Sequence, residues 1–146
     1  MAIRVAINGF GRIGRTIFKV LTDRNAPLDV VAFNDLSSPS DLAHLLKYDS
    51  VHGVWPRDVS STENEVVVDG KAYKCLKVLD PAQSPWHDLK VDIVLESSGR
   101  FVDRDSCQKH VNAGARKVIV TAPGKGMDAT FVLGVNDGSY DPSNHH

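Results

Sequence analysis

A glycine-rich run near the N-terminus carries the clearest chemical signal in the chain. Residues 3–8 are apolar enough for a buried strand, and Gly9, Gly11 and Gly14 follow with the spacing G-x-G-x-x-G. We expect Gly9 to make the tight turn out of the strand. Gly11 would let backbone N–H groups approach a phosphate, and Gly14 would allow the next helix to pack closely. Because glycines also occur in ordinary turns, the spacing alone is a weak signal.

The residues around the glycines strengthen this interpretation. Apolar residues at helical spacing predict a helix over 12–23, and a second apolar strand is predicted over 29–34. Asp35 then follows about 20 residues after the last glycine, as the dinucleotide-binding fingerprint requires. The N-terminus of the helix would offer N–H donors and a partial positive charge to a pyrophosphate. The sequence therefore predicts a dinucleotide site.

Asp35 indicates which dinucleotide is bound. A carboxylate at this strand end accepts hydrogen bonds from the hydroxyls of an adenosine ribose and repels a 2′-phosphate. We therefore expect the cofactor to be NAD rather than NADP. The alternative is that Asp35 caps the following turn, where aspartate is common.

Composition narrows the class of protein. The chain has 146 residues, 42% of them hydrophobic and 24% charged, which is typical of one globular domain with its own core. The net charge of −1 gives no general attraction to nucleic acid or to an anionic membrane. No apolar run approaches the ~18 residues of a membrane span, and no signal-peptide pattern opens the chain. We expect a cytoplasmic protein with neither nucleic acid nor membrane as a partner.

The sequence offers no candidate for a metal ligand or a nucleophile. Cys75 and Cys107 have neither metal-binding nor redox spacing, so we expect buried structural thiols. The six histidines show no ligand spacing either. No catalytic residue is therefore assigned within the chain, and no metal site is expected.

Strands and helices alternate along the chain. Further strands are predicted over 91–96, 117–121 and 130–134, a helix begins after Ser38, and another runs from its cap at Asp103 to about Ala113. A hairpin turns at Asp69-Gly70, whereas 48–62 is predicted to be an irregular loop. This order predicts an α/β fold, a Rossmann-type doubly wound and mostly parallel sheet with an antiparallel hairpin annex.

Several candidate ligand-binding residues follow predicted strands. These are the loop from Gly9 to Ile13, Asp35, Ser98 and Thr121. Because the carboxyl ends of parallel strands meet at one edge of a sheet, we expect these residues to line one crevice.

Five segments resemble the phosphorylating glyceraldehyde-3-phosphate dehydrogenases of glycolysis. They are Asn8–Arg15, Asn34–Leu36, Leu46–Gly53, Glu96–Phe101 and Gly114–Pro123, and the resemblance covers the whole chain in order.

The resemblance implies a role for each matched position. The backbone of Phe10, Gly11, Arg12 and Ile13 would hold the pyrophosphate. Asp35 would bind the adenosine ribose and Leu36 would lie near the adenine, while Ser98 and Thr121 would contact the nicotinamide-side ribose and its surroundings. Leu79 stands where the family usually has arginine. Because that family contact to adenine is made largely by the backbone, we expect NAD binding to survive.

The resemblance also implies the chemistry of a complete enzyme. A cysteine thiolate would attack glyceraldehyde 3-phosphate, a histidine would take the proton as hydride passes to NAD, and inorganic phosphate would release 1,3-bisphosphoglycerate. In the family these groups lie after the position of His146. We therefore expect residues 1–146 to be the dinucleotide-binding domain alone, inactive by itself, of an enzyme that is a homotetramer at full length.

Two other functions fit the same N-terminal pattern. One is the corresponding domain of an erythrose-4-phosphate dehydrogenase, a sister family. The other is a stand-alone regulatory module that binds NAD without catalysis.

Overall fold

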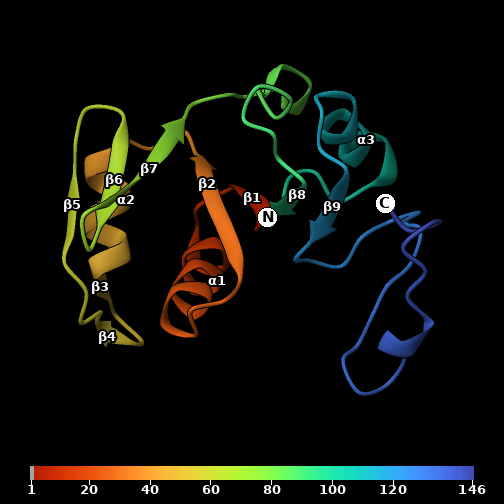
Figure 1. Ribbon diagram of the computed structural model, residues 1–146, viewed down its shortest axis with the longest axis horizontal. Helices are drawn as coiled ribbons and strands as arrows, with labels where there is room; N and C mark the ends of the chain where they lie inside the picture. Colours follow the sequence, from red (N-terminus) through yellow and green to blue (C-terminus); the bar gives the residue numbers. More distant parts are fainter. Residues whose placement is uncertain (1) are drawn as a thin grey trace.

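The computed structural model describes residues 2–146, which are built around one seven-stranded sheet with the order β5-β6-β7-β2-β1-β8-β9 (Figure 1). Five neighbouring strands of this sheet run parallel: β7 (Lys71–Leu76), β2 (Leu28–Asn34), β1 (Ile3–Asn8), β8 (Ile93–Glu96) and β9 (Lys117–Val120). Two more, β5 (Val59–Ser61) and β6 (Glu65–Val68), extend the sheet antiparallel from β7. The predicted parallel sheet with an antiparallel annex is confirmed.

The helices cover both faces of the sheet. On one face, α1 (Arg12–Asp23) and α2 (Pro39–Lys47) bury Phe18, Leu42 and Leu46 in a core that includes Ile7 of β1. On the opposite face, Ala6 of β1 belongs to a second core with Trp86, over which α3 (Arg104–Asn112) lies (Figure 1). Adjacent residues of a strand point to opposite faces, so β1 serves both cores.

The predicted helix starts are confirmed by their caps. The Ser38 hydroxyl accepts the Asp41 N–H at 3.1 Å, and the Asp103 carboxylate accepts the Ser106 N–H at 2.9 Å. Such caps satisfy backbone donors that the helix itself leaves unpaired.

The pairing of the central strands aligns three polar residues. Asn8, the last residue of β1, lies opposite Asn34 of β2 on one side and Glu96 of β8 on the other. All three side chains are buried. The sheet therefore places a row of polar groups at the carboxyl ends of its central strands.

The hairpin between β6 and β7 has the predicted turn. Asp69 and Gly70 both have positive φ angles, 49° and 81°, as a type I′ turn requires.

The loop predicted over 48–62 is wrong in part. Tyr48–Asp49 (β3) and Gly53–Val54 (β4) form a small antiparallel pair, and β5 joins the main sheet. The Asp49 carboxylate supports the turn between β3 and β4 by accepting the N–H groups of Val51 and His52. Strands of two or three residues are too short to show an alternating hydrophobic pattern.

The strand predicted over 130–134 is also wrong. Backbone N–H groups of this segment bond to side chains just ahead of them, Val132 to Asn136 and Gly134 to Asp137, near a 3₁₀ turn at Asp137–Ser139 (η2). The apolar residues that suggested a strand are largely exposed, Leu133 at 87%. Local hydrogen bonds to Asn and Asp thus replace sheet pairing. Within residues 2–146, none of the helices combines the length and apolar character of a membrane span.

Candidate functional site

A cleft of about 240 Å³ opens at the carboxyl ends of β1, β2 and β8. The strands that follow β1 in sequence lie first on its β2 side and then, from β8 on, on its other side. The order of the sheet therefore reverses between the neighbours β1 and β8, and open α/β sheets bind ligands at such a point. The lining residues come from three strand ends and from the segment after β7: Asn8, Gly9, Gly11, Asn34, Asp35, Leu36, Val78, Leu79, Ser97, Ser98, Arg100 and Phe101.

Gly9 is held between the two neighbouring strand ends. Its N–H donates to Asn34 O at 2.8 Å. Its φ angle is +87°, and a Cβ atom placed on it would lie 2.4 Å from the backbone N and Cα of Ser98. Only glycine combines this backbone conformation with so close an approach.

Gly14 and Gly11 shape the start of α1. A Cβ on Gly14 would lie 2.3 Å from Gly9 O, so the helix packs directly against the loop. A Cβ on Gly11 would meet no atom within 4 Å, and no side chain caps the helix there. The first helical hydrogen bond is donated by Arg15 to Gly11 O. The N–H groups of the first turn, which include those of Arg12 and Ile13, can therefore bind an anion.

Asp35 is fixed at the rim of the cleft by two hydrogen bonds. Its Oδ2 accepts the Phe10 N–H at 2.9 Å and its Oδ1 accepts the Ser37 N–H at 3.0 Å. The second bond is the turn cap that was the alternative interpretation of this residue. Each carboxylate oxygen retains a lone pair for a further donor such as a ribose hydroxyl.

Apolar side chains line the cleft beside Asp35. Leu36 is 57% exposed and Leu79 is 65% exposed, and Val78 lies next to Leu79 in the lining. An exposed apolar wall beside a carboxylate suits a flat base joined to a ribose.

The predicted site residues are only partly brought together. Six of them line the cleft: Gly9, Gly11, Asp35, Leu36, Leu79 and Ser98. The Phe10 ring is buried and stacks on Phe33 with 3.9 Å between the ring centroids. Arg12, Ile13 and Thr121 are not among the lining residues, and Thr121 Oγ1 instead lies 3.2 Å from both Glu96 O and Ser97 Oγ.

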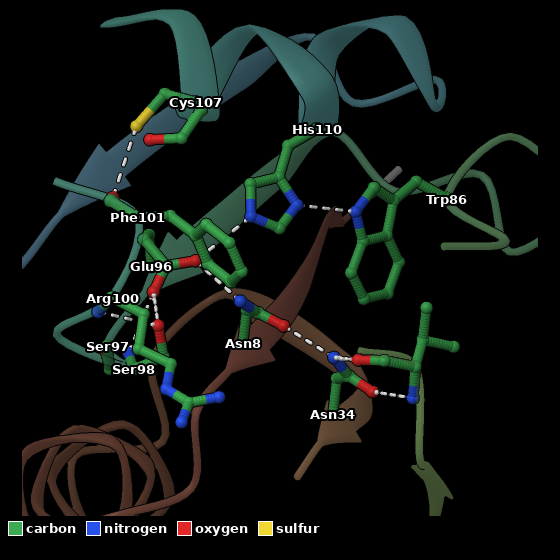
Figure 2. Close-up of polar contacts among 12 residues, drawn as sticks. Asn8, Asn34, Trp86, Glu96, Ser97, Ser98, Arg100, Phe101, Cys107 and His110 are labelled. Carbon is green, nitrogen blue, oxygen red and sulfur yellow. Dashed lines mark hydrogen bonds and ion pairs between the residues drawn. The ribbon is translucent and has the colours of Figure 1, made fainter. Parts of the chain in front are cut away.

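A buried polar network beneath the cleft was missed by sequence reasoning (Figure 2). Asn34 Nδ2 donates to Asn8 Oδ1 at 2.6 Å, and Asn8 Nδ2 donates to Glu96 Oε2 at 2.5 Å. Asn34 also exchanges hydrogen bonds with the backbone of Val78. The signal available in the sequence was a polar residue closing each of three apolar strands.

The network continues into α3 and to the cleft wall. His110 Nε2 lies 3.0 Å from Glu96 Oε2, and Trp86 Nε1 donates to His110 Nδ1 at 2.9 Å. The N–H and the hydroxyl of Ser98 both donate to Glu96 Oε1, at 2.8 and 2.5 Å (Figure 2). Glu96 is thus hydrogen-bonded to two residues that line the cleft, Asn8 and Ser98, and to His110 of α3.

Both thiols are weakly acidic. Burial, aided by the negative charges of Glu96 and Asp103, raises the pKa of Cys107 to about 11, and burial also raises the pKa of Cys75. Since the thiolate is the reactive form, we expect both cysteines of the folded chain to react slowly with Ellman's reagent at pH 8. The same chain unfolded in urea should react rapidly. Fast modification of either thiol in the folded chain would contradict this structural role.

Among residues 2–146, His, Cys, Asp and Glu side chains form no group of three that could hold a metal ion.

Comparison with known proteins places the chain in a family. Residues 3–104 match a family model described as the NAD-binding domain of glyceraldehyde 3-phosphate dehydrogenase. The chain is 50% identical over 146 residues to the glyceraldehyde-3-phosphate dehydrogenase of Streptomyces coelicolor, covering 100% of this chain and 44% of that protein.

Other relatives agree. The enzyme of the same name from Thermotoga maritima is 52% identical over 140 residues, with 95% of this chain and 42% of the relative covered. That of Geobacillus stearothermophilus is 51% identical over 146 residues, with 100% and 43% covered. The chain thus spans less than half the length of these relatives.

The matched segment includes the glycine loop, Asp35 and Ser98, and its cofactor is NAD. The chain therefore belongs to the glyceraldehyde-3-phosphate dehydrogenase family, in which it corresponds to the NAD-binding domain.

Proposed function

We propose that residues 1–146 form one dinucleotide-binding domain that holds NAD in the cleft. The complete enzyme would use NAD and inorganic phosphate to oxidise glyceraldehyde 3-phosphate to 1,3-bisphosphoglycerate, a step of glycolysis. The observation that carries this proposal is the position of Gly9. The loop fits between Asn34 and Ser98 only without a Cβ, and it leads into a helix whose first amides are uncapped.

The lining residues suggest how the dinucleotide lies. The open amides of Gly11, Arg12 and Ile13 would bind the pyrophosphate. Asp35 would accept the hydroxyls of the adenosine ribose, with the adenine against Leu36 and Leu79.

The remaining predicted site residues would contact the nicotinamide half of the ligand or hold other site residues in place. Ser98 would face the nicotinamide-side ribose. Thr121 would support that end through its contact with Ser97, and Phe10 would act by holding Asp35 through its N–H.

A calorimetric titration tests the site. We expect the chain to bind one NAD, and ADP-ribose with it, because the amides and Asp35 address the adenosine and pyrophosphate portions that both ligands share. NADP should bind more weakly. A chain that is folded by circular dichroism but shows no heat with NAD would overturn the assignment.

We expect no dehydrogenase activity from the 146-residue chain, because we assign no nucleophile in it: the pKa values of both its thiols are raised. The measurement is NADH absorbance in the presence of NAD, glyceraldehyde 3-phosphate and phosphate. NADH production by the pure chain that depends on added phosphate would contradict the proposal.

The oligomeric state and the cellular location of the complete enzyme are proposed from its family. The complete enzyme would be a cytoplasmic homotetramer that takes glyceraldehyde 3-phosphate and phosphate as further ligands, with neither a membrane nor nucleic acid as a partner. The dehydrogenases that match the whole chain support the enzyme, and the net charge of −1 supports the absence of a polyanionic partner.

A further inference from the structure

The buried Glu96 carboxylate is surrounded by hydrogen-bond donors. The residue is 1% exposed, yet its carboxylate receives four donors. Oε1 accepts the N–H and the hydroxyl of Ser98, and Oε2 faces Asn8 Nδ2 and His110 Nε2. The Ser98 N–H and the Asn8 amide nitrogen can only donate, and donors directed at a carboxylate favour its charged form.

His110 does not neutralise this charge. Trp86 Nε1 can only donate, so His110 Nδ1 must be the acceptor of their 2.9 Å hydrogen bond. The single ring proton of His110 is then on Nε2 and points to Glu96. The contact between His110 and Glu96 is therefore a hydrogen bond between a neutral imidazole and a carboxylate, rather than an ion pair.

No cation compensates Glu96 directly. Within residues 2–146, no lysine or arginine nitrogen lies within 4.0 Å of its carboxylate oxygens, and the neutral His110 ring brings no positive charge. Arg100 lines the cleft nearby but is exposed, so water screens its charge. Burying a carboxylate without a counter-ion is costly.

The position of Glu96 relates this charge to the ligand. Asp35 follows β2 directly and marks the adenosine half of the cleft, whereas Glu96 ends β8 on the other side of β1. A dinucleotide bound across this crossover places its second nucleotide over the β8 end. Ser98, which lines that end, is joined to Glu96 by two hydrogen bonds (Figure 2).

We propose that the buried charge of Glu96 makes the cleft bind oxidised NAD, whose nicotinamide ring is positively charged, more tightly than NADH, whose ring is neutral. The inference rests on the proposed NAD site and adds to it a residue that discriminates between the two redox forms. Glu96 acts here as a positioning and electrostatic residue, since Ser98 separates it from the cleft.

The test compares dissociation constants for oxidised NAD, NADH and ADP-ribose, measured by calorimetry. In Glu96→Gln we expect the ratio of the dissociation constant for NADH to that for oxidised NAD to fall about tenfold, which means a weaker preference for oxidised NAD. A tenfold change corresponds to the interaction energy of two unit charges about 12 Å apart at an effective dielectric constant of about 20. The affinity for ADP-ribose, which lacks the ring, should change about equally with the NADH affinity, and so reports damage to the cleft.

A charge-swap variant provides the matched control. In Asn8→Asp/Glu96→Gln the charge moves to the residue whose side chain lies 2.5 Å from Glu96. The introduced glutamine amide can donate to that carboxylate, while its oxygen still accepts from Ser98, and the His110 N–H loses its acceptor. We expect this double variant to recover most of the preference for oxidised NAD. Loss of geometry alone would leave the preference low in both variants.

The possible outcomes separate this inference from the site assignment. An unchanged ratio in a folded Glu96→Gln chain that still binds ADP-ribose overturns the inference and leaves the NAD site standing. Failure of the unmodified chain to bind either redox form overturns both. Should neither variant fold, the unmodified chain decides: NADH binding as tightly as oxidised NAD overturns the inference, and a severalfold preference for oxidised NAD supports it.

Discussion

Replacing Gly9 with alanine is expected to abolish NAD binding and to lower the free energy of unfolding by about 3 kcal/mol, because a strained backbone conformation and an overpacked contact each cost about 1–3 kcal/mol. The new Cβ would be forced into the Ser98 backbone at 2.4 Å, and the residue would have to keep a φ of +87°. Relief of the clash would move the loop away from β8 and so open the cleft between its two walls.

Gly11→Ala is the matched control for the effect on stability. It adds the same methyl group two residues later, where no atom lies within 4 Å and φ is −74°. We expect its melting temperature to remain within about 5 °C of the unmodified chain, in keeping with the modest cost of alanine at a helix N-cap. Thermal melts and NAD titrations of both variants give the result. Unmodified NAD affinity in Gly9→Ala would refute the proposed role of the loop.

The second large effect is expected at Asp35. In Asp35→Ala we expect NAD affinity to fall about 10- to 100-fold, since hydrogen bonds to a charged group contribute about 1.5–3 kcal/mol. NADP should lose much less, because the carboxylate that repels its 2′-phosphate is gone. The two cofactors, titrated against each variant, should therefore approach the same dissociation constant.

Asp35→Asn distinguishes cofactor recognition from support of the loop. Its side-chain oxygen can still accept the Phe10 N–H, now 2.9 Å from Asp35 Oδ2, whereas alanine leaves that donor without a partner. We expect asparagine to retain more stability than alanine while it still loses the preference for NAD. If either folded variant keeps the unmodified ratio of NAD to NADP affinity, the role of Asp35 in choosing the cofactor is wrong.

Elements with strong local signals were predictable from the sequence. The strand, glycine turn and helix from Ile3 to Asp23 match their predicted bounds, and the caps at Ser38 and Asp103 mark the next helices correctly. Prediction was wrong where the local signal was short or misleading. The pair β3–β4 has two residues in each strand, and the apolar run over 130–134 has its amides bonded to nearby side chains.

The candidate site was predictable only where it is local in sequence. The glycine loop and Asp35 belong to one fingerprint with fixed spacing. The network beneath them joins Asn8 to Glu96, which are 88 residues apart, and Asn34 to Asn8, which are 26 apart. These contacts depend on the order and register of β2, β1 and β8, which no single stretch of sequence encodes.

The division of the core into two layers has a practical consequence. Trp55 is buried in the layer with α1 and α2, and Trp86 is buried in the layer beneath α3. Each side of the sheet therefore contains its own intrinsic fluorophore. In single-tryptophan versions of the chain, stopped-flow fluorescence would follow the folding of each side separately. The two rates would show whether the two sides form together around β1, the strand that they share.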